Sequence, residues 1–146
     1  MNGKLILLIE DNPDDEALTL RALKKNEIQS DIKVARDGQE ALDYFFGDQG
    51  LINPMPTVVL LDLMLPKVNG LEILRRIRSD KRTRLQPVVI LTSSKEEQDI
   101  IKGYELGANS YIRKPVDFIQ FTEAVRQLGL YWLIINEAPP ALARNS

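Results

Sequence analysis

The sequence contains no cysteine and no histidine. Without cysteine, disulfide bonds, thiolate metal sites and cysteine nucleophiles are excluded. Without histidine, imidazole bases, Ser-His-Asp triads and most zinc sites are excluded, and the chain cannot itself carry a phosphohistidine. These two absences remove more classes of enzyme than any motif in the sequence.

Net charge and long apolar runs are also scarce. The formal net charge of -2 gives no electrostatic reason to expect nucleic acid or anionic lipid as a partner. No apolar run approaches the ~20 residues that cross a bilayer, and the first residues do not form a signal-peptide core. We therefore predict a cytoplasmic protein with no nucleic-acid partner and no membrane partner. Its 146 residues fit one domain.

Three short apolar runs end in acidic or polar residues. Residues 5–9 precede Glu10 and Asp11, residues 58–61 precede Asp62, and residues 88–91 precede Thr92. Apolar runs without alternation are typical of strands buried on both faces of a parallel sheet, and ligands bind at the carboxyl edge of such a sheet. We therefore expect the three carboxylates to converge on one edge.

Carboxylates held close together repel each other, by about 1 kcal/mol per pair at ~4 Å in water and about 4 kcal/mol at an effective dielectric constant near 20. A site that keeps them together needs a cation. Oxygen ligands without nitrogen or sulfur donors favour Mg2+ over zinc or copper. Taken alone, Glu10 and Asp11 could cap a helix and Asp62 could be a loop acid, but their combination favours a metal site.

Strand and helix patterns alternate five times along the chain. This alternation predicts an α/β protein with an open, doubly wound, five-stranded parallel sheet and helices on both faces. In the third predicted helix, the spacing of the apolar residues leaves Arg75, Arg76 and Arg78 facing solvent. Strands are expected at residues 5–9, 32–35, 58–62, 87–92 and 111–113, and helices at 13–26, 40–46, 71–77, 93–106 and 118–128.

Four strand ends carry a recognisable set of residues: Glu10-Asp11, Asp62 within Asp62-Leu63-Met64-Leu65-Pro66, Thr92-Ser93 and Lys114-Pro115. In order, type and spacing this set resembles the receiver domain of two-component response regulators, over roughly residues 4–128. The resemblance implies a flavodoxin-like sheet with strand order 2-1-3-4-5. We assign residues 1–135 to a receiver domain and residues 136–146 to a C-terminal tail, which is either flexible or an interface arm.

The resemblance also implies a phosphorylation site. Asp62 resembles the residue that takes a phosphoryl group from the phosphohistidine of a sensor histidine kinase. Asp11, Asp62 and the backbone carbonyl of Met64 resemble direct Mg2+ ligands, and Glu10 resembles a partner that contacts the ion through water. These roles imply a signalling protein and not an enzyme, apart from its own phosphotransfer and slow dephosphorylation.

The remaining family residues carry implied roles of their own. Lys114 would pair with one phosphoryl oxygen and the Thr92 hydroxyl with another, while Tyr111 occupies the switch position that responds to Thr92. In relatives the peptide bond before Pro115 is cis. Each residue also has an ordinary interpretation: Lys114 as a surface lysine, Thr92 as a strand end, and Tyr111 as a half-buried strand tyrosine.

The residues after the last predicted helix pattern are unusually apolar. Residues 128–135 read Leu-Gly-Leu-Tyr-Trp-Leu-Ile-Ile, which either folds back on the core or forms an interface. This segment and the long loop before the third strand resemble single-domain regulators paired with cyanobacterial and bacterial phytochromes. The resemblance implies a phytochrome-type kinase partner and a homodimer formed through the fourth helix, the fifth strand, the fifth helix and the C-terminal extension, with Tyr131 and Trp132 at the interface.

Two functions other than phosphoacceptance could be expected of a protein with this fold and these residues. A haloacid-dehalogenase-type phosphatase needs a second acid two residues after its nucleophile, where this chain has Met64. A receiver-like interaction module that works without phosphorylation remains the alternative, although its usual signature, a missing acid or lysine, is not present here.

Overall fold

Five β-strands and five α-helices alternate along the chain, as the sequence predicted. The structure is a computed structural model and describes residues 4–25, 30–47, 53–66, 68–93, 96–114 and 117–139. The elements are β1 (Leu5–Ile9), α1 (Pro13–Lys25), β2 (Asp31–Ala35), α2 (Gly38–Phe46), β3 (Val58–Leu61), α3 (Gly70–Ser79), β4 (Val88–Thr92), α4 (Glu97–Glu105), β5 (Ser110–Arg113), α5 (Phe118–Leu130) and the π-helical turn η1 (Tyr131–Ile135).

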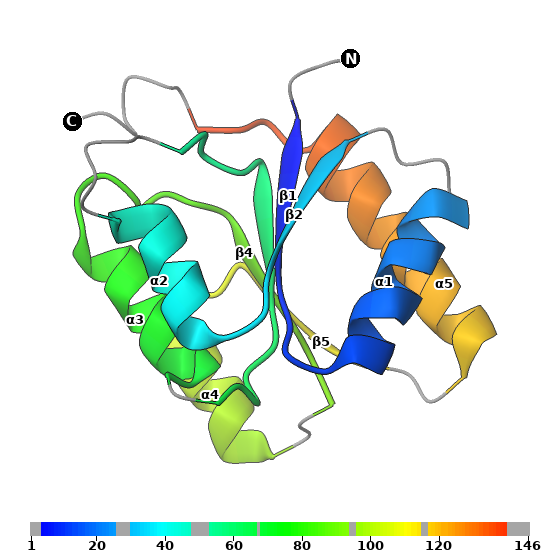
Figure 1. The fold of residues 1–146 in the computed structure, drawn as a ribbon, viewed down its shortest axis with the longest axis horizontal. Coiled ribbons are helices and arrows are strands. Elements are labelled where there is room, and N and C mark those ends of the chain that lie inside the picture. Colours follow the sequence, from blue (N-terminus) through cyan, green and yellow to red (C-terminus); the bar gives the residue numbers. More distant parts are fainter. Residues whose placement is uncertain are drawn as a thin grey trace.

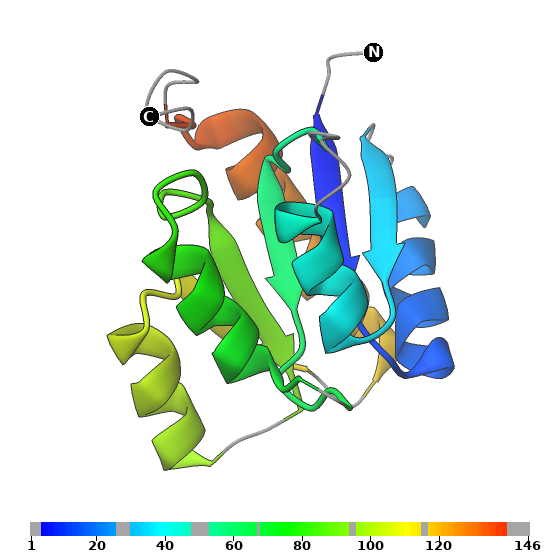
Figure 2. The ribbon, with the colours of Figure 1, turned by 60° about the vertical axis from the view of Figure 1, so that its left-hand side comes forward.

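The strands form one parallel sheet in the order β2-β1-β3-β4-β5, which confirms the predicted topology. Helices α1 and α5 cover one face of the sheet, and α2, α3 and α4 cover the other (Figures 1 and 2). Because all strands run the same way, their carboxyl ends lie at one edge. The register brings Ile9 opposite Leu61 and Leu61 opposite Ile90, so the residues after these strands are neighbours.

The sheet separates two hydrophobic clusters. Successive side chains of a strand point to opposite faces, so alternate residues of β1 and β3 enter different clusters. Ile6, Leu8 and Leu60 pack with α1 and α5, whereas Leu7 and Leu61 pack with α2 and α3. Both faces are therefore buried, which explains why these strands read as continuous apolar runs.

Side-chain caps explain where most helices begin. The Asn12 carboxamide oxygen accepts hydrogen bonds from the backbone N–H groups of Asp14 and Asp15 at 2.9 and 3.1 Å, with Pro13 at the first helical position. Asp37, Asn69 and Asp117 cap α2, α3 and α5 in the same way. These caps place the first turns of α1 and α3 next to the carboxyl edge of the sheet.

Helix α4 differs from the sequence prediction at its start. It begins at Glu97 after Glu96, which makes no side-chain cap hydrogen bond, rather than at Ser93. Beyond its end, Gly107 has φ +96°, a backbone conformation that favours glycine. Pro115, whose preceding peptide bond is expected to be cis, lies outside the described residues.

Arg78 does not face solvent, so its prediction was wrong. Its guanidinium donates to the backbone carbonyls of Gly107 at 2.7 Å and Gln86 at 2.7 Å, and to the Asn109 side-chain oxygen at 3.0 Å. Burial lowers the pKa of this guanidinium from its usual value. Arg78 thus links α3 to the loops that precede β4 and β5, using acceptors that no local pattern in the sequence indicates.

The apolar segment 128–135, at the end of α5 and in η1, folds partly onto the core. Leu128, Trp132 and Leu133 are buried in the cluster beneath α1 and α5, while Tyr131 is 47% exposed. Trp132 packs within this cluster, with only 9% of its surface exposed. Residues 140–146 of the predicted tail lie outside the described part. In the part of the chain that is described, no helix is both long and apolar enough to span a membrane.

Candidate phosphoryl and cation site

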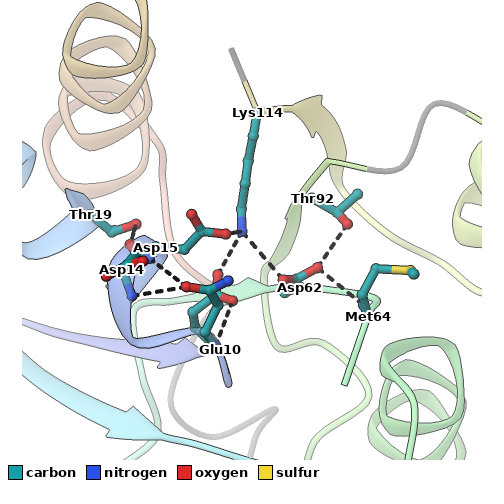
Figure 3. Close-up of polar contacts among 9 residues, drawn as sticks. Glu10, Asp14, Asp15, Thr19, Asp62, Met64, Thr92 and Lys114 are labelled. Atoms are coloured by element: carbon teal, nitrogen blue, oxygen red, sulfur yellow. Dashed lines mark hydrogen bonds and ion pairs between the residues drawn. The ribbon is translucent and has the colours of Figure 1, made fainter. Parts of the chain in front are cut away.

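Most of the predicted site residues meet at the carboxyl edge of the sheet, and Figure 3 shows Glu10, Asp62, Thr92 and Lys114 together there. Glu10 and Asp11 follow β1, Asp62 follows β3, Thr92 ends β4 and Lys114 follows β5. The parallel topology brings together these residues, which are up to 104 positions apart in sequence. This edge is where doubly wound proteins bind ligands.

Three carboxylates form a group with the spacing of a metal site. One oxygen from each of Glu10, Asp11 and Asp62 lies within 4.8 Å of the others. Glu10 and Asp62 are buried, whereas Asp11 is exposed, so a cation could approach from the Asp11 side. The donor set contains only oxygen, and it fits a hard divalent cation.

Lys114, which follows β5, contacts two acids of this group, Glu10 and Asp62. Its side chain is only 7% exposed, and its Nζ atom lies 2.7 Å from Glu10 Oε1, 2.8 Å from Asp15 Oδ2 and 3.3 Å from Asp62 Oδ2. An ammonium group has three protons to donate, so these three carboxylates can satisfy it completely. A buried lysine needs such partners, because an unpaired charge at this depth is strongly unfavourable.

The buried charges shift each other's pKa values. Burial would lower the pKa of Lys114, but its hydrogen bonds to Asp15 and Glu10 and the charge of Asp62 outweigh burial, and the pKa is raised. Burial raises the pKa of Glu10 to about 7; Lys114 opposes this shift and the neighbouring Asp62 adds to it. Removing the charge of Lys114 or of Asp62 would therefore change the pKa of Glu10.

Hydrogen bonds fix the carboxylate of Asp62. Its Oδ1 atom accepts from the Thr92 hydroxyl at 2.7 Å and from the backbone N–H of Met64 at 3.1 Å. Its Oδ2 atom faces Lys114. The carboxylate is therefore held in one orientation by groups from β4, β5 and its own loop. The Met64 side chain itself is 62% exposed.

Tyr111, the predicted switch residue, lies on β5 opposite Ile90 of β4. Its ring packs against the cluster beneath α2 and α3. A Cβ atom at Gly103 of α4 would lie 3.4 Å from the Tyr111 ring and 2.9 Å from Ile90 Cδ1. The missing side chain at Gly103 thus lets α4 lie close to Tyr111.

The sequence analysis missed Asp15. Acids in the first turn of a helix usually complement the helix dipole, but Asp15 Oδ2 lies 2.8 Å from Lys114 Nζ, nearly as close as Glu10 Oε1 at 2.7 Å. One signal could have identified it. A helix that starts directly after β1 must place its first turn at the same edge as Glu10, so its acids compete for any buried lysine there.

Comparisons with known proteins agree with this geometry. Residues 6–126 match the response regulator receiver domain family. The probable methanogenesis regulatory protein FilR2 of Methanothrix harundinacea is 40% identical over 135 residues, which cover 92% of this chain and 87% of FilR2.

Two solved structures are similar over most of their length. The phosphorylated cyanobacterial phytochrome response regulator RcpA is 36% identical, with a TM-score of 0.88, and the match covers 94% of this chain and 99% of RcpA. The Mn2+-bound form of response regulator Rcp1 is 34% identical, with a TM-score of 0.86 and the same coverages.

A doubly wound sheet with an acidic group, a buried lysine and a threonine at its carboxyl edge defines a phosphorylation-based signalling protein. The chain belongs to the response regulator receiver domain family.

Proposed function

We propose that this protein accepts a phosphoryl group on Asp62 from the phosphohistidine of a sensor histidine kinase, and that the modification changes its protein-binding surface. The observation that carries this proposal is the buried Asp62 carboxylate, held between Lys114 and Thr92 beside Glu10 and Asp11. Family membership supports the same chemistry.

In the proposed transfer, one carboxylate oxygen of Asp62 attacks phosphorus. A new O–P bond forms as the P–N bond to the donor imidazole breaks, and the electron pair of that bond stays with the imidazole. Lys114 would move from Asp62 to a phosphoryl oxygen and keep a positive charge beside it. The Thr92 hydroxyl would donate to a second phosphoryl oxygen.

We propose Mg2+ as the cation at this site. Asp11, Asp62 and the backbone carbonyl of Met64 would hold it directly, and Glu10 would contact it through water. The bound ion would neutralise charge on the carboxylates and on the incoming phosphoryl group. The all-oxygen donor set supports this assignment, and so does the Mn2+-bound form of the similar Rcp1.

A phosphorylation assay tests the function directly. Incubation with acetyl phosphate and Mg2+ should add the mass of one phosphoryl group to the intact protein, and EDTA should prevent the addition. The physical reason is that the donor anion must approach three carboxylates whose charge Lys114 only partly balances. A protein that stays unmodified with acetyl phosphate and with sensor kinases would instead be an interaction module that works without phosphorylation.

We propose that the signal reaches the surface through Thr92 and Tyr111. If the Thr92 hydroxyl moves toward a phosphoryl group on Asp62, space opens near β4 for the Tyr111 ring to turn inward. The close approach of α4 at Gly103 supports this coupling, because a shift of the ring would also move α4. The kinase partner we propose is a bacterial phytochrome, as the similarity to the phytochrome regulator RcpA supports.

We also propose that the receiver domain extends to residue 135 and forms a homodimer. The proposed interface comprises α4, β5, α5 and η1, which carry several exposed apolar side chains: Ile101, Tyr104, Ile119, Tyr131, Ile134 and Ile135. Tyr131 remains the candidate anchor, because large aromatic side chains contribute most to interface energies.

Analytical ultracentrifugation tests the dimer. The Tyr131→Ser variant should raise the dimer dissociation constant about tenfold or more, since a central aromatic contact is typically worth over about 1 kcal/mol. Leu85→Ser is the matched control, because Leu85 is 37% exposed but lies between α3 and β4. A parent protein that sediments as a monomer at high micromolar concentration, with or without phosphorylation, would rule out the dimer.

A further inference from the structure

Among the described residues, Asp15 is the one carboxylate in contact with Lys114 that lies outside the three-acid group. Its Oδ2 atom is 2.8 Å from Lys114 Nζ, which is closer than Asp62 Oδ2 at 3.3 Å. Figure 3 shows Asp15 reaching Lys114 from α1, on the side opposite Asp62. The described residues that could hold a cation are Glu10, Asp11 and Asp62, without Asp15.

The position of Asp15 is fixed by its own backbone. Its N–H donates to the Asn12 side-chain oxygen at 3.1 Å, and its carbonyl accepts from the hydroxyl of the buried Thr19 at 2.9 Å. Because both bonds lie within the first turns of α1, the carboxylate is presented to Lys114 by a rigid element.

The other two partners of Lys114 each have a second task in the proposed reaction. Glu10 and Asp62 belong to the acidic group that fits a cation, and Asp62 also receives the phosphoryl group. When the carboxylate oxygens of Glu10 and Asp62 face the cation or the phosphoryl group, Lys114 loses two of its three hydrogen-bond acceptors. Asp15 is then the remaining carboxylate in contact with the ammonium.

We propose that Asp15 is a positioning residue for Lys114, which it holds beside the phosphoryl site while Glu10 and Asp62 are engaged elsewhere. This inference rests on the proposed phosphorylation of Asp62. Without the Asp15 contact, a long and flexible lysine side chain would sample other orientations, and fewer of them would place Nζ on the phosphoryl group.

A double-mutant cycle with phosphoramidate as donor tests the proposal. Asp15→Ala should slow phosphorylation of Asp62 about tenfold, the size of effect expected for a lost charge-assisted contact of about 1.4 kcal/mol. In a Lys114→Ala background the same change should alter the rate by less than about twofold, because two residues that act through one contact are not additive.

Asp14→Ala is the matched control. Asp14 lies in the same helical turn and carries the same charge, but its side chain is exposed. It should leave the rate within about twofold of the parent. An equal loss from Asp15→Ala with and without Lys114, or an equal loss in the Asp14→Ala control, would show a general charge or folding effect and overturn the proposal.

A second measurement does not depend on phosphorylation. In the protein saturated with Mg2+, where the ion would engage Glu10 and Asp62, the Lys114 ammonium protons should exchange slowly enough to give a 15N-correlated NMR signal. That signal should vanish in Asp15→Ala and persist in Asp14→Ala. If the parent is not phosphorylated but the signal behaves this way, the proposed function fails and the contact stands. A signal that persists in Asp15→Ala overturns the positioning role.

Discussion

Asp62→Asn should abolish phosphoryl uptake while leaving the protein folded. The amide keeps the shape of the side chain, and its oxygen can still accept the bonds now made by Thr92 and the Met64 N–H to Oδ1. The attacking oxygen, however, is replaced by a nitrogen without a nucleophilic lone pair. We expect the phosphorylation rate to fall by more than about a thousandfold, as when other enzymes lose their nucleophile.

Intact-mass measurement after treatment with acetyl phosphate and Mg2+ checks this result. Asp31→Asn is the control, because Asp31 starts β2 and is exposed at the opposite edge of the sheet. It should be phosphorylated like the parent. If Asp62→Asn gains the same mass, the acceptor is another residue, and the role assigned to Lys114 and Thr92 is lost with it.

Gly70→Ala should destabilise the fold and the site together. A Cβ atom at Gly70 would lie 2.6 Å from the Asp62 carbonyl oxygen and 2.6 Å from Leu63 Cα. Both are backbone atoms that no side-chain rotation can move. Gly70 also donates its N–H to the Leu63 carbonyl at 3.1 Å, so α3 cannot move away without breaking that bond. We expect a loss of about 2–3 kcal/mol in the free energy of unfolding.

Urea denaturation of Gly70→Ala and Gly103→Ala measures this difference. At Gly103 the nearest atom to an added Cβ is the Ile90 Cδ1 methyl, at 2.9 Å, and a terminal methyl can shift. The higher helix propensity of alanine, worth about 1 kcal/mol, offsets part of that cost. Gly103→Ala should therefore lose less than about 1 kcal/mol. Equal stability of the two variants would contradict the argument from backbone contacts.

The sequence predicted the sheet well because its central strands are buried on both faces. Continuous apolar runs of four or five residues are too short for typical helices and fit buried strands, and the polar residue after each run marks its end. The start of α4 was less predictable, since Ser93 and the residues after it look like a helix cap in isolation. The structure begins α4 at Glu97, after Glu96, which makes no side-chain cap hydrogen bond.

Site residues that follow strands could be predicted, and residues that depend on tertiary contacts could not. The meeting of Glu10, Asp11 and Asp62 follows from parallel topology alone. The hydrogen-bond acceptors of Arg78 lie on loops that are distant in sequence, and Asp15 pairs with Lys114, which lies 99 positions later in the chain. Trp132 belongs to an apolar segment, and its packing in the cluster beneath α1 and α5 is a further tertiary contact that no local pattern indicates.

The separation of Lys114 from its acidic partners has a consequence for synthesis on the ribosome. Lys114 is translated 104 residues after Glu10 and 52 residues after Asp62, yet its buried ammonium group pairs with both carboxylates in the folded protein. Until β5 emerges, β1 and β3 can pair only with their acids still facing water, because burying them unmatched is too unfavourable. An incomplete nascent chain therefore lacks the buried, charge-matched site, which forms only after β5 and Lys114 have been translated.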